Sequence, residues 1–325
     1  MKIDSYALAR MLGISQATVS RAFTRPEKVS EATRKKIMEA AETLGYAPDR
    51  HASALRRQGS STIMLLYIKR EDGHYWTNIK RNSWIFSEAV LSLTRLFEKL
   101  PYNFEIRQIE SVFSVNPSRI RDHCDGLLVF DFVSEEEARA ISEWKIPYVL
   151  CHRTIHLRNY NHSATDNRGG GRIQGQYLAN LGTEHPAYVI DEEDPFSHPL
   201  RRKGFEEQYP ETLVINTENK QEMESTLIDA IREEKIDGFA FVNDMLLVQI
   251  MTRLAHSGIK LDPGFPLIGY DNSTVLMALD HKPASIEIGI ASIYREAAEA
   301  LIELITGERD SISLVHEPAL VAPEG

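Results

Sequence analysis

Short apolar runs alternate with helix-like segments over most of this 325-residue chain, and this alternation restricts its fold more than any other feature. The runs have the length and composition of buried parallel strands, and they lie at 63–68, 104–109, 126–132, 147–151, 187–191, 213–216, 238–242 and 267–270. Between them, apolar residues recur at helical spacing, most clearly around Phe86 and Leu301. Strands that alternate with helices along the chain predict a doubly wound α/β architecture, and the number of strands is enough for two sheets. A binding site would then lie at the carboxyl ends of the strands.

Charge is divided unevenly along the chain. The whole chain has a formal net charge of −10, yet residues 1–60 contain eleven Lys and Arg against six acidic residues. That segment is therefore +5, and the remaining 265 residues are −15. This asymmetry predicts a small basic module attached to a larger acidic one. A solvated run of surface charge is the alternative interpretation.

Composition is that of an ordinary globular protein of two or three domains, with 42% apolar and 26% charged residues. No run approaches the roughly 18 apolar residues of a membrane helix. The first thirty residues lack the apolar core of a secretory signal. Two cysteines without a CxxC pair do not make a disulfide framework. We therefore expect a cytoplasmic protein that does not associate with a membrane.

Residues 1–48 have the pattern of three short helices. Gly13 ends the first helix in the position where a left-handed residue is easily accommodated, and Ser15 and Ser30 can cap the second and third. Two helices joined by the three-residue turn 13–15 form a helix-turn-helix. A three-helix scaffold that binds another protein is the alternative to a DNA-binding module.

The second helix has the side chains of a recognition helix. With Val19 turned inward, Gln16, Ala17 and Arg21 face outward near the end that enters the major groove. Arg21 can donate two hydrogen bonds to guanine, and Gln16 can pair with an adenine edge. Short hydroxyl donors suited to phosphate oxygens accompany them at Ser15, Thr18 and Ser20.

This segment resembles the N-terminus of the LacI/GalR family of bacterial transcription regulators. The resemblance is carried by LARMLGISQATVSR at 8–21, VSEATR at 29–34 and LGYAP at 44–48. It implies a sequence-specific DNA-binding transcription regulator, most often a repressor, that forms a homodimer or a tetramer. Its partner would be double-stranded DNA with a near-palindromic operator. The resemblance also implies base contacts by Gln16, Ala17 and Arg21.

The same resemblance implies a hinge and linker at residues 49–60. A helix in this segment would become ordered when the dimer meets its operator. Ala52, Leu55 and Arg56 are the expected minor-groove residues, with Leu55 as an apolar wedge that kinks the DNA.

More weakly, residues 61–325 resemble the periplasmic-binding-protein-like core of the same family, with two doubly wound lobes and three crossovers. Lobe one is expected at about 61–160 and 289–315, and lobe two at about 161–288 and 316–325. The supporting strings are DGLLV at 125–129, TDN at 165–167, RRKGF at 201–205, FVND at 241–244 and IGYDN at 268–272.

Residues in these strings face an effector cleft in the family, which nominates Asp166, Arg201, Asn243 and Asp271. Carboxylates and amides pair with sugar hydroxyls, and a guanidinium donates parallel hydrogen bonds, so a sugar or sugar-derived effector fits. A helix cap or a turn is the alternative role for each residue. The effector would shift the population between lobe arrangements and so change operator affinity, in a direction that the sequence leaves open.

The segment after the first strand departs from the family pattern. Residues 69–84 form a longer stretch with four Lys and Arg and two tryptophans. Trp84 or Trp76 could stack on a sugar face, and the cations could pair with a phosphate or carboxylate. A phosphorylated or acidic sugar is therefore one hypothesis for the effector, and a solvated loop is the alternative.

No motif indicates catalysis, a cofactor or a metal. The glycines at 169–171 lack the lysine of a P-loop and the spacing of a dinucleotide-binding loop. The pair His152 and His156 is weak support for zinc. The sequence therefore predicts no enzyme, no cofactor and no metal. The alternative function is a cytoplasmic sugar-binding or sugar-processing protein whose N-terminal module docks onto another protein.

Overall fold

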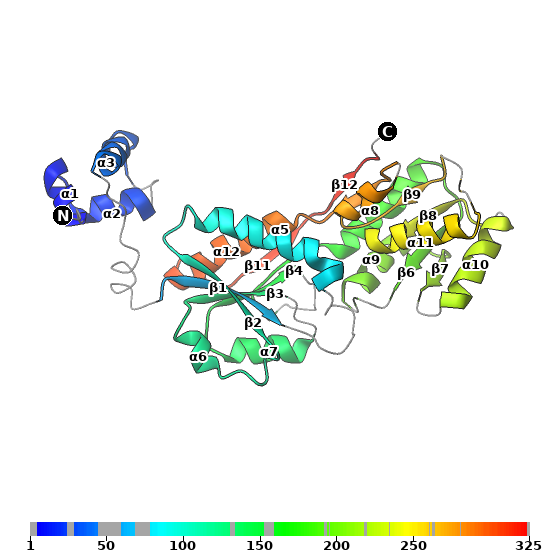
Figure 1. The fold of residues 1–325 in the computed structure, drawn as a ribbon, viewed down its shortest axis with the longest axis horizontal. Coiled ribbons are helices and arrows are strands. Elements are labelled where there is room, and N and C mark those ends of the chain that lie inside the picture. The colour runs from blue at the N-terminus through cyan, green and yellow to red at the C-terminus, as the bar shows by residue number, and fades with distance from the viewer. Residues whose placement is uncertain are drawn as a thin grey trace.

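The structure is a computed structural model that describes residues 5–24, 29–44, 60–68, 79–130, 134–152, 159–191, 194, 196–217, 220–233, 235–259, 261, 264–279 and 281–323. Three helices are followed by two parallel sheets with helices packed on them (Figure 1). This is the predicted fold class. The expected minor-groove residues Ala52, Leu55 and Arg56, and also Trp76, lie outside the described residues. Within the described ranges, no helix is both long enough and apolar enough to cross a membrane.

The N-terminal module consists of the helices α1 (Ser5–Leu12), α2 (Gln16–Thr24) and α3 (Glu31–Thr43). Gly13 joins α1 to α2 with φ at +67°, a backbone conformation that glycine adopts without strain. Ser15 Oγ accepts the Thr18 N–H at 3.1 Å, and Ser30 Oγ accepts the Thr33 N–H at 3.3 Å. Both predicted N-caps are confirmed. The three helices share a small core formed by Leu8, Ala9, Val19, Ala22, Ile37 and Ala41.

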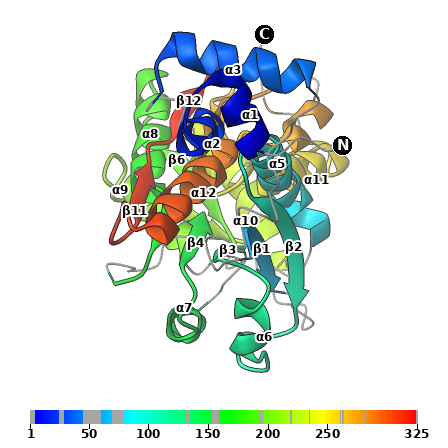
Figure 2. The same ribbon diagram turned by 90° about the vertical axis from the view of Figure 1, so that its left-hand side faces the viewer.

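The first lobe is built on a six-stranded parallel sheet. Its order is β11 (Ser313–His316), β5 (His162–Thr165), β4 (Tyr148–His152), β3 (Gly126–Phe130), β1 (Thr62–Ile68) and β2 (Asn103–Ile109). One face carries α5 (Ile79–Phe97) and α12 (Ile290–Thr306), and the other carries α6 (Pro117–Arg121) and α7 (Glu135–Glu143) (Figures 1 and 2).

Strand β1 explains why both faces need helices. Ile63, Leu65 and Tyr67 belong to the hydrophobic core under α5 and α12, whereas the intervening Met64, Leu66 and Ile68 belong to the core under α6 and α7. Successive side chains of a strand point to opposite faces, so an uninterrupted apolar run must be covered on both sides.

The second lobe is built on a four-stranded parallel sheet. Its order is β7 (Leu213–Asn216), β6 (Pro186–Ile190), β8 (Gly238–Phe241) and β9 (Leu267–Ile268). The helices of this lobe are α8 (Asn167–Asn180), α9 (Ser197–Glu206), α10 (Lys220–Arg232) and α11 (Asp244–His256). A short helical turn η3 (Thr274–Ala278) follows β9, and β10 (Ser285–Glu287) pairs with β12 (Ala319–Val321) in an antiparallel ribbon.

The chain crosses between the lobes three times. The crossovers follow β5, β10 and β11, because β5 and β11 lie in the first sheet whereas α8 and β12 belong to the second lobe. The side chain of Thr165 in the first crossover donates a hydrogen bond to the carbonyl of Ile288 in the second, at 3.4 Å. The first crossover therefore lies at about residue 166, a few residues later than the sequence analysis placed it.

Candidate functional site

A cleft lies between the lobes, where the carboxyl ends of strands from both sheets meet. It has about 710 Å³ of empty space, part of it open to solvent. Its lining residues are Trp84, Ile85, His152, Thr165, Asn167, Asp194, Ser197, His198, Arg201, Asn243, Met245, Asp271, Ser273 and Ile288. Four of the residues nominated from the sequence, Trp84, Arg201, Asn243 and Asp271, line this one cleft. Strand ends of this kind are the usual place for a ligand in doubly wound sheets.

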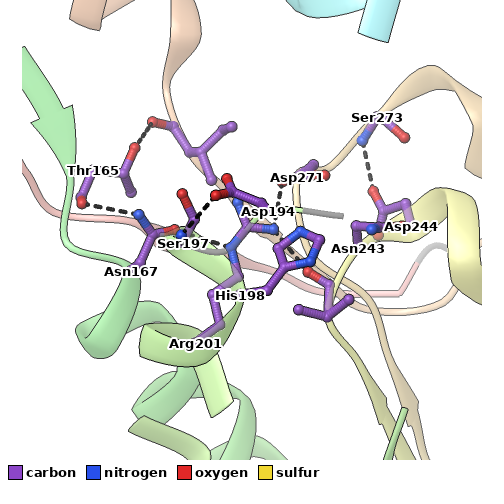
Figure 3. A network of polar contacts seen from close by, with 12 residues as sticks. Thr165, Asn167, Asp194, Ser197, His198, Arg201, Asn243, Asp244, Asp271 and Ser273 are labelled. Carbon is purple, nitrogen blue, oxygen red and sulfur yellow. Dashed lines mark hydrogen bonds and ion pairs between the residues drawn. The ribbon is translucent and has the colours of Figure 1, made fainter. Parts of the chain in front are cut away.

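Arg201 is the centre of the polar network in this cleft (Figure 3). It lies in α9 and is only 7% exposed. Its Nε–H donates to Asn167 Oδ1 at 2.9 Å, and Nη1 donates to the carbonyl of Val242 at 2.7 Å and lies 3.1 Å from Asp271 Oδ1. The guanidinium also stacks 3.8 Å from the ring centroid of Tyr270. These contacts fix the plane of the guanidinium before any ligand arrives.

Asp271 follows β9 with φ at +101°, in the left-handed region that is uncommon for residues other than glycine. Its backbone N–H donates to the carbonyl of Ile286 at 2.7 Å, which ties this strained turn to β10. Burial raises the pKa of the Asp271 carboxyl to about 6, although Arg201 and His198 oppose the shift. The carboxylate is therefore held in the cleft at a cost in desolvation that Arg201 partly offsets.

Asp244 holds this turn against the start of α11. It is completely buried, and its two carboxyl oxygens accept hydrogen bonds from the Ser273 N–H at 2.7 Å and the Ser285 hydroxyl at 2.8 Å. Its own N–H donates to the carbonyl of Tyr270 at 2.8 Å. Burial raises the pKa of Asp244 to about 8, so the carboxyl retains its proton at neutral pH.

Asn243 and His198 are both linked to Asp191, which follows β6. Asn243 caps α11, since its Oδ1 accepts the Leu246 N–H at 2.7 Å. Its Nδ2 donates to Asp191 Oδ2 at 3.4 Å, and His198 Nδ1 lies 2.8 Å from Asp191 Oδ1. Asp194 Oδ1 accepts the Ser197 N–H at 3.0 Å and so helps to start α9 beneath the cleft.

The lobe-one wall of the cleft is mostly aromatic and aliphatic. Trp84 and Ile85 come from α5, Ile288 from the second crossover, and His152 from the end of β4. The His152 backbone has φ at +57°, and its Nδ1 lies 2.8 Å from the hydroxyl of Tyr294. The aromatic ring of Phe130 packs behind His152 with centroids 5.1 Å apart. This wall offers a flat apolar face to a ligand.

Asp166 is the nominated residue that the structure does not place among the cleft-lining side chains. It is the N-cap of α8, and its Oδ1 accepts the Gly169 N–H at 2.9 Å. The glycines that follow allow close packing: a β-carbon at Gly170 would overlap with the Tyr270 hydroxyl, and one at Gly171 would overlap with the backbone of Arg201. The triple glycine therefore lets α8 lie against α9 and Tyr270.

Several cleft residues escaped the sequence analysis, among them Asn167, Asp194, Ser197 and His198. One signal could have found two of them. Ser197 and His198 precede Arg201 by four and three positions, so all three lie on one face of a helix.

The nominated DNA-contacting residues lie at the start and along the length of α2. Arg21 is exposed, as a base-reading residue must be. The hydroxyls of Ser15 and Thr18 lie 2.8 Å apart, so the two expected phosphate contacts form one polar cluster at the start of the helix. Gln16, Ala17 and Ser20 have helical backbone in α2, and their side chains lie outside the described part of the structure.

No group of three or more His, Cys, Asp or Glu side chains among the described residues is arranged to hold a metal ion.

Two family models match the chain. Residues 7–49 match "Bacterial regulatory proteins, lacI family", and residues 176–322 match "Periplasmic binding protein-like domain". The first match covers the helix-turn-helix, and the second covers most of lobe two and the return to lobe one.

Curated relatives match over nearly the whole chain. The HTH-type transcriptional regulator CelR of Thermobifida fusca is 25% identical over 98% of this chain and 96% of its own length. GalS of Salmonella typhimurium, also an HTH-type transcriptional regulator, is 25% identical over 93% of this chain and 90% of its own. The sucrose operon repressor of Streptococcus mutans is 26% identical over 82% of this chain and 81% of its own.

Solved structures share the fold. A CelR–cellobiose complex superimposes with a TM-score of 0.66 at 23% identity, covering 99% of both chains. The lac repressor dimer bound to operator and the anti-inducer ONPF superimposes with a TM-score of 0.64 at 16% identity, covering 99% of this chain and 98% of its own.

Proposed function

The chain is a member of the LacI family of bacterial regulatory proteins, and we propose that it is a transcription repressor whose operator affinity is set by a sugar or sugar derivative bound between its lobes. The helix-turn-helix would supply the sequence-specific contact with double-stranded DNA, through Gln16, Ala17 and Arg21 on bases and Ser15, Thr18 and Ser20 on phosphates. Residues 49–60 would form the hinge, with Ala52, Leu55 and Arg56 at the minor groove.

The observation that carries the sugar assignment is the two-sided chemistry of the cleft. Lobe two contributes Arg201, Asn243, Asp271 and neighbouring polar side chains, whereas lobe one contributes Trp84 and aliphatic residues. A sugar ring has hydroxyl groups around its edge and an apolar face of C–H groups. Its hydroxyls would pair with the amide, carboxylate and guanidinium groups, and its apolar face would stack on Trp84. The CelR structure with cellobiose supports the same assignment by analogy.

The charge of the lining favours an uncharged sugar over an acidic or phosphorylated one. Among the described residues, the cleft lining contains two carboxylates, those of Asp194 and Asp271. The guanidinium of the lining, that of Arg201, already pairs with Asp271. A phosphate would therefore depend on the four cations of residues 69–84, whose side chains lie outside the described part. Sugar phosphates are accordingly the comparison ligands in the experiment below.

The effector would act by population shift. It touches both lobes, so it would favour the lobe arrangement in which both walls of the cleft contact it. In a homodimer, that arrangement would determine whether two hinges and two recognition helices reach a near-palindromic site together.

The proposal is tested by selecting binders of the full-length protein from a randomised DNA pool, with and without sugars. We expect enrichment of a palindrome and a steep fall of affinity with added salt. Cellobiose, sucrose, ribose and galactose would be added in turn. The effect of each uncharged sugar on DNA binding would be compared with the effect of glucose 6-phosphate. If the protein enriches no DNA under any of these conditions and its affinity for DNA is independent of salt, the result would instead favour the protein-docking alternative.

A further inference from the structure

One completely buried glutamine joins the ends of two neighbouring strands of the second lobe. Gln174 lies in the middle of α8, and its side-chain nitrogen donates hydrogen bonds to two backbone carbonyls. One is the carbonyl of Phe241, the last residue of β8, at 2.8 Å. The other is the carbonyl of Gly269, the residue directly after β9, at 2.9 Å. Both hydrogens of the amide group are therefore used, and the two acceptors determine its orientation.

These two carbonyls lie where the sheet ends and the cleft begins. β8 and β9 pair through only two residues each, and the pairing stops before Phe241 and Gly269. Two positions after Phe241 the chain reaches Asn243, and two positions after Gly269 it reaches Asp271. Both of these residues line the cleft. Gln174 therefore connects the two strands just before each of them supplies a cleft side chain.

Gln174 shares one face of α8 with the residues that contact Arg201. Asn167, Gly171 and Gln174 are separated by four and three positions, so they lie on the same side of the helix. Asn167 accepts the Arg201 Nε–H, and Gly171 lies against the Arg201 carbonyl. Arg201 in turn donates to the carbonyl of Val242, the residue after β8, at 2.7 Å. The same face of α8 thus supports the guanidinium and both strand ends.

The turn after β9 is held from a second direction as well. A β-carbon at Gly269 would overlap with Oδ1 of Asp244, so the backbone there packs directly against this buried carboxyl. Asp244 also accepts the Ser273 N–H at 2.7 Å, beyond the Asp271 position. With Asp244 on one side and the Gln174 amide on the other, the backbone that leads to Asp271 has little freedom to shift.

We propose that Gln174 is a positioning residue for effector recognition, whose amide sets the separation between the Asn243 and Asp271 side chains. This inference rests on the proposed sugar-binding function of the cleft. The hydroxyl groups of a sugar are fixed relative to one another by its ring, so side chains that recognise them must be held to within about 0.5 Å. Loss of the Gln174 amide lets the strand ends move apart, which weakens sugar binding and changes the preference among sugars.

Two substitutions at Gln174 remove its hydrogen bonds in steps. Gln174→Met keeps an unbranched side chain of similar size but removes both donors. Gln174→Glu keeps the shape, and because the position is completely buried the introduced carboxyl is protonated and donates one hydrogen bond. Calorimetry would use whichever sugar of the panel binds the wild-type protein most tightly. We expect Gln174→Met to weaken that sugar about ten-fold, and Gln174→Glu to give an intermediate loss.

Gln176→Met is the matched control, because Gln176 is exposed on the same helix and should tolerate the change without loss of sugar affinity. Operator binding without sugar verifies that each variant is folded. If Gln174→Met does not fold, Gln174→Glu is used for the same measurements.

Two further measurements separate positioning from a general loss of stability. A variant that is merely less stable loses the same proportion of its affinity for every sugar, whereas displaced strand ends change the ratio of affinities between sugars. A double-mutant cycle would use Asn243→Ser, which retains a helix-capping oxygen, and Asp271→Asn. If Gln174 acts through these side chains, the effect of Gln174→Met on sugar affinity should shrink in at least one of the two backgrounds.

The outcomes distinguish this inference from the function on which it rests. If no sugar of the panel binds the wild-type protein, the sugar-effector proposal fails and this inference fails with it. If a sugar binds the wild type and the Gln174 variants equally well, the inference alone is overturned. Additive effects in both backgrounds, or the same relative loss for every sugar that binds, would overturn the positioning role of Gln174.

Discussion

The backbone of Gly171 in α8 lies directly against the carbonyl group of Arg201 in α9, and any β-carbon at Gly171 would overlap with that oxygen. The close approach of the two helices sets the position of the cleft guanidinium. We expect Gly171→Ala to push the helices apart, to reduce the free energy of unfolding by about 1–3 kcal/mol and to weaken sugar binding. Urea unfolding and calorimetry would measure both effects. Gly264→Ala is the control, since a β-carbon at Gly264 would have no atom within 4 Å apart from those of its chain neighbours. An equal loss there would contradict the packing argument.

Loss of the Arg201 guanidinium should leave the Asp271 carboxylate buried without its cation. We expect Arg201→Ala to reduce the free energy of unfolding by about 3–5 kcal/mol at pH 8. The reduction should be smaller at pH 6, because Asp271 can then take up a proton. The neighbouring Arg202 pairs with Glu206 on the surface at 2.6 Å. Arg202→Ala should therefore reduce the free energy of unfolding by no more than about 1 kcal/mol. Similar losses for the two variants would contradict the role of the buried pair.

Asp244 should make the protein less stable as the pH rises. The carboxyl ionises near pH 4 in an unfolded chain, whereas burial raises its folded-state pKa to about 8. Between these values the folded protein retains a proton that the unfolded chain has lost. Its contribution to stability is therefore complete below pH 4 and is lost as the pH rises through 8. Asp244→Asn should flatten the dependence of unfolding free energy on pH between 5 and 8, whereas the exposed Asp122→Asn should leave it unchanged.

Arg21 should determine base preference rather than general affinity for DNA. Its exposed side chain near the end of α2 can reach a guanine edge. We expect Arg21→Ala to weaken the free energy of binding to the selected operator by about 1–3 kcal/mol and to relax the base preference at one position. Binding to a panel of single-base operator variants would measure this. A uniform loss on every sequence would indicate a phosphate contact instead.

Sequence patterns predicted the central strands of both sheets but missed those at the crossovers. β1, β3 and β4 are continuous apolar runs because helices cover both of their faces. β5 has the sequence HSAT and β11 has SLVH, and neither contains such a run. Their polar side chains pair with each other and with the crossovers, as Ser163 does with His316 at 2.9 Å. Strands stabilised by such long-range contacts carry little local signal.

The site shows the same division between local and long-range information. Arg201, Asn243 and Asp271 follow recognisable strings and lie together in the cleft. Asp166 has an equally recognisable string, but its side chain caps α8. Which role a carboxylate takes depends on the direction of its side chain at the start of a helix, and no spacing rule specifies that direction.

The N-terminal module and the two lobes differ in how they can be exchanged between proteins. The helix-turn-helix is one continuous segment with a hydrophobic core of its own. Each lobe, in contrast, is assembled from separate stretches of the chain, and one hydrophobic cluster includes residues of both. A recombination event that cuts once between the module and the core could give the same sensor a new operator. No single cut could exchange one lobe, because each lobe is completed by stretches on both sides of the other.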